Sequence, residues 1–296
     1  LGDLAGARAL QAEVLARWEA AAGPRHPGAL AAAASLGMIL QRGGILDEAR
    51  ALQERVLRDS REVFGATAID TWTAQRQLAA TLNLLGDRAG ARALLAEVVA
   101  GLTQRLGATH PEALLVRGEL GMAAQAMGAL DEADAELAPA IAGLMTQLPA
   151  DHRVLLDLRG AQLRLWIAQG RLVAARGLLA TLWPLVQGKF GPASAGAGLF
   201  ASGVGEAWSR AGAASDAVVW LRRALDLLLQ TQPAEAATVT CAMALATAIV
   251  QARGEPALAR EGLTRASEQV RQRLGAEHHF VAELAAHGVK LGLVPS

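Results

Sequence analysis

Hydrophobic residues recur along this chain every three or four positions, in segments of about 16 to 18 residues. Leu36 and Leu40 are four positions apart, with Gly37 between them, and the same spacing returns at Leu78 and Leu82. Residues three or four apart share one face of a helix. The pattern therefore predicts amphipathic helices, each with one buried face.

The helices are organised by a repeat of 42 residues. One glycine occurs in every period, at Gly2, Gly44, Gly86, Gly128, Gly170, Gly212 and Gly254. An alanine follows each of these glycines five residues later, at Ala7, Ala49, Ala91, Ala133, Ala175, Ala217 and Ala259. A second turn recurs at Gly23, Gly65, Gly107, Pro149, Gly191, Pro233 and Gly275. Below, positions separated by multiples of 42 are called equivalent.

Each period predicts a first helix and a second helix joined by a glycine turn. Glycine adopts positive φ at low cost, which suits a helix C-terminus. The alanine is expected where the two helices cross, because a larger side chain would force them apart. The predicted pairs are 27–62, 69–105, 111–147, 153–189, 195–230 and 237–273.

A lone second helix at 3–19 and a closing first helix at 279–291 complete a single solenoid over residues 1–296. Because the chain opens on a second helix, we expect it to be a piece of a longer protein.

Composition supports an all-α fold and narrows the function. Hydrophobic residues make up 52% of the chain but aromatic residues only 3%, and alanine and leucine favour helices. The net charge is zero, whereas nucleic-acid binders usually carry a basic excess. No apolar run reaches the roughly 18 residues of a membrane span. We therefore expect neither nucleic acid nor membrane as a partner.

Residue usage indicates the origin and location of the protein. Cys241 is the single cysteine, so no internal disulfide forms, which is compatible with a reducing, cytoplasmic location. Lys189 and Lys290 are the only lysines among 28 basic residues. This arginine-rich bias indicates a bacterial, GC-rich genome.

No residues with catalytic or cofactor-binding spacing stand out. His26, His110, His152 and His278 are equivalent, but residues one repeat or more apart cannot share a metal ion at about 2 Å. We interpret these histidines as turn caps. Cys241 lies within a predicted helix without a basic neighbour, which indicates an inert thiol. The sequence therefore predicts no enzyme activity, no catalytic residue, no metal and no cofactor.

Two segments carry a resemblance to a known family. The stretch Thr81–Asp87, followed by Ala91, and the loop Leu106–Glu112 resemble the tetratricopeptide repeat, in the longer kinesin-light-chain type common in bacterial multidomain proteins. HEAT repeats have a similar period but lack the Leu-Gly turn followed by alanine. The resemblance implies a right-handed α-solenoid, a superhelix of antiparallel helix pairs.

In that family, a concave face of the first helices binds peptides. The residues predicted there are Met38, Gln41, Arg76, Asn83, Met122, Gln125, Asp157, Arg164 and Glu206. One column is polar at five of six repeats: Gln41, Asn83, Gln125, Ser209 and Gln251, with Ile167 as the exception. Amides can pair with a peptide backbone in either direction. The alternative, that these are ordinary surface residues, stays open.

The chain departs from the family in the middle of the first helices. Where the family carries peptide-gripping asparagines, this chain has Arg76-Gln77 and Gly118-Glu119. Small residues there leave room for an apolar or bulky partner, and Arg76 would be the strongest polar anchor. We expect a scaffold that binds a protein or peptide. The alternative is a sensory or regulatory arm of a signalling ATPase, kinase or caspase-like protease whose catalytic domain lies elsewhere.

Overall fold

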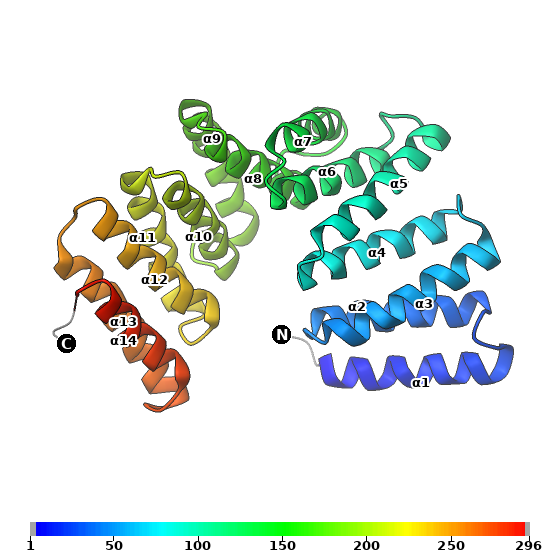
Figure 1. Ribbon diagram of the computed structural model, residues 1–296, viewed down its shortest axis with the longest axis horizontal. Coiled ribbons are helices and arrows are strands. Elements are labelled where there is room, and N and C mark those ends of the chain that lie inside the picture. The colour runs from blue at the N-terminus through cyan, green and yellow to red at the C-terminus, as the bar shows by residue number, and fades with distance from the viewer. Residues whose placement is uncertain (1–3, 294–296) are drawn as a thin grey trace. The chain divides into compact units, whose positions relative to one another are not determined.

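The computed structural model describes residues 4–293, and this part of the chain contains fourteen helices and no strand. The chain divides into two compact units, Leu1–Gln147 and Leu148–Ser296. Each unit consists of successive antiparallel helices that pack against their neighbours in sequence (Figure 1). The all-α class and the helix pairs are confirmed. The single solenoid over 1–296 stays a prediction, since each unit is described by itself.

The first unit is built from a lone helix and three helix pairs. Its helices are α1 (Leu4–Ala22), α2 (Pro27–Arg42), α3 (Leu46–Phe64), α4 (Ile69–Leu85), α5 (Arg88–Leu106), α6 (Pro111–Ala126) and α7 (Leu130–Met145). The even-numbered members are the first helices of the repeats, and the first helices α2 and α4 also contact each other.

The second unit is built from three pairs and a closing helix. Its helices are α8 (Arg153–Ala168), α9 (Leu172–Phe190), α10 (Ala195–Arg210), α11 (Ala214–Thr231), α12 (Ala236–Gln251), α13 (Pro256–Leu274) and α14 (His279–Lys290). The bounds of the six predicted pairs agree with the structure to within two residues. The opening helix continues three residues beyond its predicted end.

The equivalent histidines cap helices, as predicted. Nδ1 of His26 accepts a hydrogen bond from the Gly28 N–H at 3.1 Å, and Nδ1 of His110 accepts one from the Glu112 N–H at 3.2 Å. His152 and His278 make the same contact at 3.3 Å each. Each bond satisfies a backbone donor that the first turn of a helix leaves free. This pattern explains why histidine recurs at one position of the repeat.

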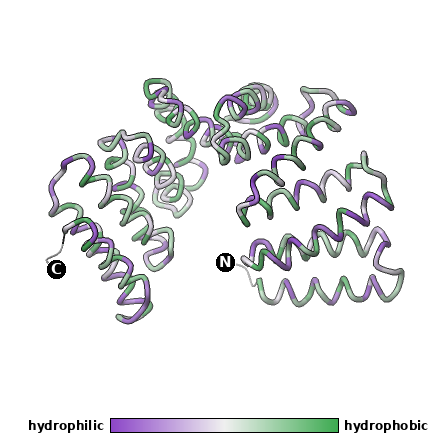
Figure 2. The backbone as a smooth tube through the Cα atoms, viewed as in Figure 1, coloured by the Kyte–Doolittle hydropathy of each residue, from purple (hydrophilic) through white to green (hydrophobic). Residues whose placement is uncertain are grey.

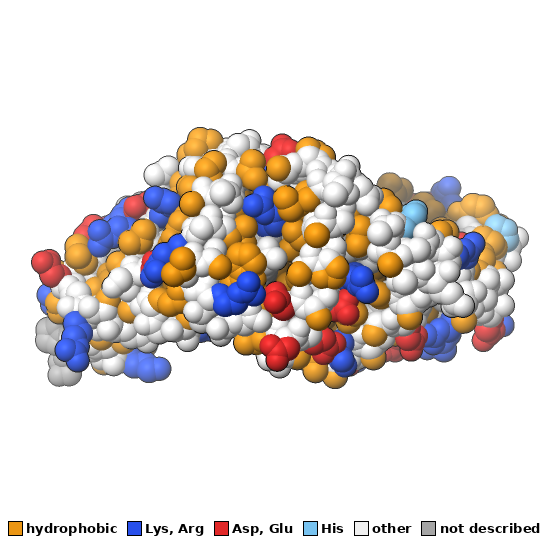
Figure 3. All heavy atoms as spheres, turned by 90° about the horizontal axis from the view of Figure 1, so that it is seen from above, with side chains coloured by type: hydrophobic (Ala, Val, Ile, Leu, Met, Phe, Trp, Pro, Cys, Tyr) orange, Lys and Arg blue, Asp and Glu red, His pale blue; other side chains and the backbone are white. Residues whose placement is uncertain are grey.

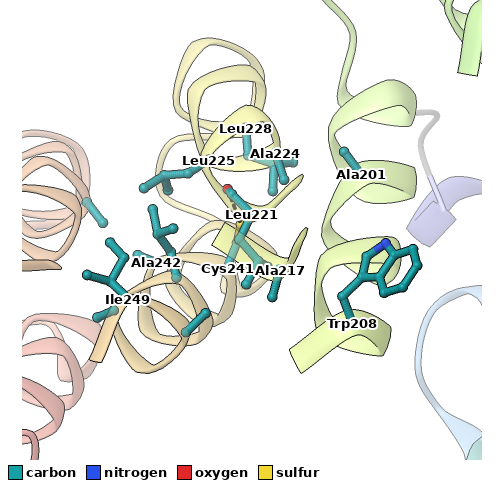
Figure 4. Close-up of a cluster of buried hydrophobic side chains, with 14 of the residues drawn as sticks. Ala201, Trp208, Ala217, Leu221, Ala224, Leu225, Leu228, Cys241, Ala242 and Ile249 are labelled. Carbon is teal, nitrogen blue, oxygen red and sulfur yellow. Dashed lines mark hydrogen bonds between the residues drawn. The ribbon is translucent and has the colours of Figure 1, made fainter. Parts of the chain in front are cut away.

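Six of the seven alanines that follow the glycine turns are buried, as the predicted helix crossings require, while Ala7 on α1 is exposed. We call the buried six the crossing alanines, and they are 0% exposed at Ala49, Ala91, Ala133, Ala175, Ala217 and Ala259. Figure 2 shows hydrophobic and hydrophilic stretches alternating along the helices. In the second unit the hydrophobic faces meet in a cluster that includes Trp208, Leu221 and Leu228, all 0% exposed (Figure 4). Close helix packing thus depends on small residues at the crossings.

The first glycine of the repeat adopts positive φ in five repeats but not in the sixth. Gly44, Gly86, Gly128, Gly170 and Gly212 have φ between 73° and 88°, while Gly2 lies outside the described residues. The prediction is wrong at Gly254, because Arg253 has the positive φ instead, at 53°. Proline disfavours helical backbone in the residue before it. Pro256 therefore accounts for the extended Glu255, with ψ of 123°, where the equivalent Ala213 has 62°.

This exception predicts that Arg253→Gly stabilises the protein. A left-handed conformation costs a residue with a Cβ about 1–2 kcal/mol, whereas glycine adopts it readily. We expect the free energy of unfolding, measured by urea denaturation, to rise by about 1 kcal/mol. Gly212→Ala is the opposite control, because Gly212 has φ of 75° with no heavy atom within 4 Å of an added Cβ. Gly212→Ala should lower the free energy of unfolding by a similar amount. An Arg253→Gly variant that is less stable than the wild type would contradict this account.

Candidate functional site

The first unit contains a groove of about 730 Å3 along its first helices. Helices α2, α4 and α6 supply most of the walls, and α5 supplies two residues. The lining residues are Met38, Gln41, Thr73, Arg76, Gln77, Ala80, Asn83, Leu84, Arg88, Leu95, Glu119, Met122, Ala123 and Ala126. Three successive repeats therefore contribute equivalent faces to one concave surface.

Helix α4 forms the middle of the groove because its lining residues share one face. Thr73, Arg76, Ala80 and Asn83 follow one another at spacings of three or four residues, which places them on one side of a helix. The opposite side of α4 carries Leu78 and Leu82, which are buried in the core of the unit. Helix amphipathicity thus separates the groove from the core.

An ion pair spans the groove from α4 to α6. Arg76 donates from Nε to one carboxylate oxygen of Glu119 at 3.0 Å and from Nη2 to the other at 2.7 Å. Burial would lower the pKa of Arg76, but the hydrogen bonds and charge of Glu119 outweigh it, so this pKa lies above its usual value. A two-bonded pair of this kind is geometrically specific. A carboxylate from a partner would have to compete with Glu119 for the guanidinium.

Two amide oxygens in the groove have no hydrogen-bond partner among the described residues. They are Oε1 of Gln77 and Oδ1 of Asn83, and both atoms are buried. The Gln77 amide nitrogen lies 3.5 Å from the sulfur of Met38, which is a weak acceptor. An unpaired buried acceptor costs about 1–3 kcal/mol. Either amide would have to turn its oxygen toward the groove before a ligand N–H could donate to it.

Methionine and alanine form the apolar parts of the wall. Met38, Ala80 and Met122 are equivalent positions on the three first helices, and all three line the groove. Met38 is 40% exposed, and Leu84, at the edge of the groove, is 60% exposed. Methionine side chains adapt their shape to different partners. The alanine between the two methionines leaves open space at the centre.

Five of the residues predicted from the sequence line this groove. They are Met38, Gln41, Arg76, Asn83 and Met122. Gln125 lies one turn from Met122 on α6 but is outside the lining set. Its equivalent in the next repeat, Ile167, is 1% exposed and belongs to the core of the second unit. The polar column is therefore interrupted because that position is buried.

The other three predicted residues, Asp157, Arg164 and Glu206, belong to the second unit. Burial raises the pKa of Asp157, although the charges of Arg153 and Arg164 act in the opposite direction. Burial and then the charge of Arg210 lower the pKa of Arg164. Glu206 accepts a hydrogen bond from the Ser202 hydroxyl at 3.2 Å. The structure places these residues in a different unit from the groove.

Sequence reasoning missed Glu119 and Gln77 as groove residues. Both occupy positions where the family carries asparagines. Arg76 and Glu119 are 43 residues apart, one period plus one. Opposite charges at that spacing lie on adjacent first helices, and this signal could have identified the ion pair.

Cys241 is buried and inert, as predicted. It is 0% exposed, and its thiol lies 3.5 Å from the carbonyl oxygen of Leu221. Burial raises the pKa of Cys241 to about 12, from an ordinary value of 9.0. Because the thiolate is the reactive form, Cys241 stays an unreactive thiol in the folded protein at neutral pH.

The raised pKa predicts a loss of stability in alkaline solution. Between about pH 9 and pH 12 the unfolded thiol loses its proton while the buried thiol keeps it. The unfolded state then binds fewer protons, so the free energy of unfolding falls as pH rises. We expect a steeper fall in the wild-type chain than in Cys241→Ala, measured by urea denaturation across this range. Parallel pH profiles would contradict the prediction.

Charges of both signs are mixed on the surface. On the face seen in Figure 3, basic and acidic side chains lie among each other and among hydrophobic ones. Several acidic groups pair with arginines of a neighbouring repeat, including Arg92 with Glu132 at 2.7 Å and Arg176 with Asp216 at 2.7 Å.

Within residues 4–293, no helix is both long and apolar enough to cross a membrane.

Comparisons with known proteins agree with the repeat architecture. Family models described as "Tetratricopeptide repeat" match residues 1–62 and 71–112. Putative kinesin light chain repeats from Podosopora anserina are 27% identical, with a TM-score of 0.54, over 63% of this chain and 88% of theirs. No curated protein matches the chain.

More distant structures share the fold over nearly the whole length. A tetratricopeptide repeat protein from Parabacteroides merdae is 16% identical, with a TM-score of 0.57, over 97% of this chain and 93% of its own. NprR in complex with its cognate peptide NprX is 12% identical, with a TM-score of 0.57, over 97% and 81%. Residues 1–62 and 71–112 thus match the tetratricopeptide repeat, and the chain shares its fold with solved proteins that contain such repeats.

Proposed function

We propose that this tetratricopeptide-repeat chain binds a peptide or an extended segment of another protein in the groove of its first unit. The observation that carries the proposal is the convergence of equivalent residues from three successive repeats on one groove. Repeat proteins of this kind use such extended surfaces for binding. Tetratricopeptide repeats are generally scaffolds, and we assign the described residues a binding role, in a cytoplasmic protein, and no catalysis.

The chemistry of the groove favours a segment with exposed backbone N–H groups and an apolar side chain. Gln77 and Asn83 supply buried acceptors without partners, and a bound backbone would donate to them once these amides turn toward the groove. Met38 and Met122 flank the space above Ala80, which would receive the apolar side chain. The Arg76–Glu119 pair would orient the segment, since its two charges lie on the adjacent first helices α4 and α6 and are 2.7 Å apart. The fold that NprR shares with this chain accommodates a peptide in that protein.

The test begins with a random peptide library displayed on phage and selected on the immobilised 296-residue chain. Affinities of the selected peptides are then measured by isothermal titration calorimetry. Asn83→Ala removes a buried acceptor and Met122→Ala removes apolar contact, so each should weaken binding about 5- to 10-fold, or about 1–1.4 kcal/mol. Gln251→Ala is the matched control, because Gln251 is equivalent to Asn83 but lies in the second unit. Peptides that bind all three variants like the wild type would contradict the proposal.

A further inference from the structure

One position on the second helices carries a large side chain in every repeat except the last. The large residues are Leu10, Leu52, Leu94, Glu136, Leu178 and Trp220, and the last repeat has Gly262. Trp220 on α11 shows what this position contacts, because its ring packs against Trp183 on the preceding second helix, α9. Gly262 on α13 supplies no such side chain toward α11.

A cavity of about 260 Å3 lies at this point between α11 and α13. Leu225, Leu245 and Leu258 line it together with Gly262. Leu225 is 1% exposed and Leu245 is 3% exposed, so the core of the second unit holds the apolar floor in place. Helix α10 precedes these helices and α14 follows them. The cavity therefore belongs to the internal packing of the unit and not to an end of the chain.

The equivalent point between α9 and α11 is closed by two indole rings. Trp183 is equivalent to Leu225, and Trp220 is equivalent to Gly262. The two ring centroids are 5.2 Å apart, with an interplanar angle of 82°. This edge-to-face contact is one of the arrangements that aromatic rings prefer. The repeat thus has room for an indole at the point where α13 provides only a glycine.

An arginine accompanies this point in both repeats. The guanidinium carbon of Arg223 lies 4.8 Å from the ring centroid of Trp220 and 5.4 Å from that of Trp183. Its equivalent on α13, Arg265, lines the cavity and pairs with Asp226 on α11 at 2.9 Å. A guanidinium can donate to a carboxylate with its edge and stack on a ring with its face. Arg265 is therefore positioned to cover a ring, although the cavity lining contains no aromatic residue.

Two further charged side chains at the cavity suit the polar groups of a polypeptide. Arg222 on α11 and Glu261 on α13 both line the cavity, and both are exposed. A guanidinium donates to a backbone carbonyl, and a carboxylate accepts from a backbone N–H. The rim thus offers a donor and an acceptor to the main chain on either side of a bound side chain.

We propose that the cavity between α11 and α13 binds a tryptophan side chain of another protein, with Arg265 stacked on the indole. Trp220 and Arg223 show this arrangement one repeat earlier, within the chain itself. Trp18, the most exposed tryptophan of the described residues at 41%, already stacks on His26 with ring centroids 5.0 Å apart. A second copy therefore has no spare indole to supply. The site lies in the second unit and does not depend on peptide binding in the groove of the first.

The probe for this site is N-acetyl-L-tryptophanamide, which presents an indole between two peptide groups. We expect it to bind the 296-residue chain with a dissociation constant on the order of 1 mM, as a small ligand with one ring does. In 15N NMR spectra it should shift the amide resonances of Gly262 and Leu225. N-acetyl-L-leucinamide should bind about fivefold more weakly, because it lacks the ring that Arg265 would cover.

Filling the cavity from within should remove the binding. Gly262→Trp and Gly262→Leu introduce the residues found at Trp220 and Leu178, and each should lower the affinity for the probe about tenfold or more. A Cβ at Gly262 would lie 3.5 Å from Leu245 and 3.6 Å from Leu225, which is ordinary contact. Both variants should therefore fold, as circular dichroism checks.

Two controls separate this effect from others. Gly177→Trp adds an indole to α9 where a Cβ meets no heavy atom within 4 Å, so it should bind the probe like the wild type. Arg265→Gln should weaken binding of the tryptophan probe about threefold and leave the leucine probe unchanged. Ala80→Trp, which fills the groove of the first unit, should not alter the shift at Gly262, so the two sites can fail separately.

Four results would overturn the proposal. The first is a probe that leaves the Gly262 resonance in place, and the second is wild-type affinity in both Gly262 variants. Tighter binding of free L-tryptophan than of the probe would identify a free amino acid as the occupant. Self-association of the chain in ultracentrifugation that Gly262→Trp abolishes would identify a second copy instead.

Discussion

Gly205→Val is expected to destabilise the second unit by about 3 kcal/mol, the upper end of the usual cost of overpacking. A Cβ at Gly205 would lie 2.6 Å from Cγ of Leu221 and 3.0 Å from its backbone nitrogen. The side chain could move aside, but the backbone of α11 could not without separating the two helices. Leu221 and Trp208 belong to the same buried cluster (Figure 4), so the loss should extend to the packing around them.

Gly203→Val on the same helix is the matched control. A Cβ at Gly203 would meet no heavy atom within 4 Å, and the change in helix propensity is the same at both positions. Because valine is a better helix former than glycine, Gly203→Val should be neutral or stabilising by about 0.5 kcal/mol. Urea denaturation followed by circular dichroism measures both. Equal stabilities of the two variants would show that the close approach at Gly205 does not limit the packing.

The sequence predicted the helices well because every repeat has the same requirements at its turns and helix crossings, so the same residue types recur at fixed positions. Turns need residues with positive φ, and crossings need alanine or glycine, so both recur at fixed positions. The exception at Gly254 shows the limit of this reasoning. Repeat position alone assigned the turn to Gly254, whereas Pro256 constrains the preceding backbone and moves the left-handed residue to Arg253. Here the steric effect of the proline, and not the position in the repeat, determines which residue has positive φ.

The groove was predictable only in part, for a different reason. Equivalent positions on the first helices identify a shared face, and this placed Asn83 and Met122 correctly on one surface. Which polar groups remain available depends on side-chain pairing, which the repeat does not encode. Arg76 was expected to be the strongest polar anchor for a ligand, but its guanidinium already donates two hydrogen bonds to Glu119. Asp157 belongs to the second unit, although its spacing continues the same pattern.

Ala80→Trp is expected to abolish peptide binding in the groove, with a loss of about 100-fold or more in affinity, or about 2.7 kcal/mol. Ala80 is exposed on α4 between the equivalent Met38 and Met122. An indole there would fill the space in which the ligand's apolar side chain is proposed to lie. Because the alanine is exposed, the larger residue should leave the free energy of unfolding nearly unchanged.

Ala89→Trp separates this effect from a general effect of a surface tryptophan. Ala89 is an exposed alanine at the start of α5 and is outside the groove lining, so its replacement should bind the selected peptides like the wild type. Calorimetric titration of both variants with the same peptide compares them directly. Blocking by Ala80→Trp together with intact folding requires the ligand to pass over the centre of α4. Wild-type affinity in Ala80→Trp would instead place the ligand on another surface of the repeats, since no peptide could occupy the groove around that indole.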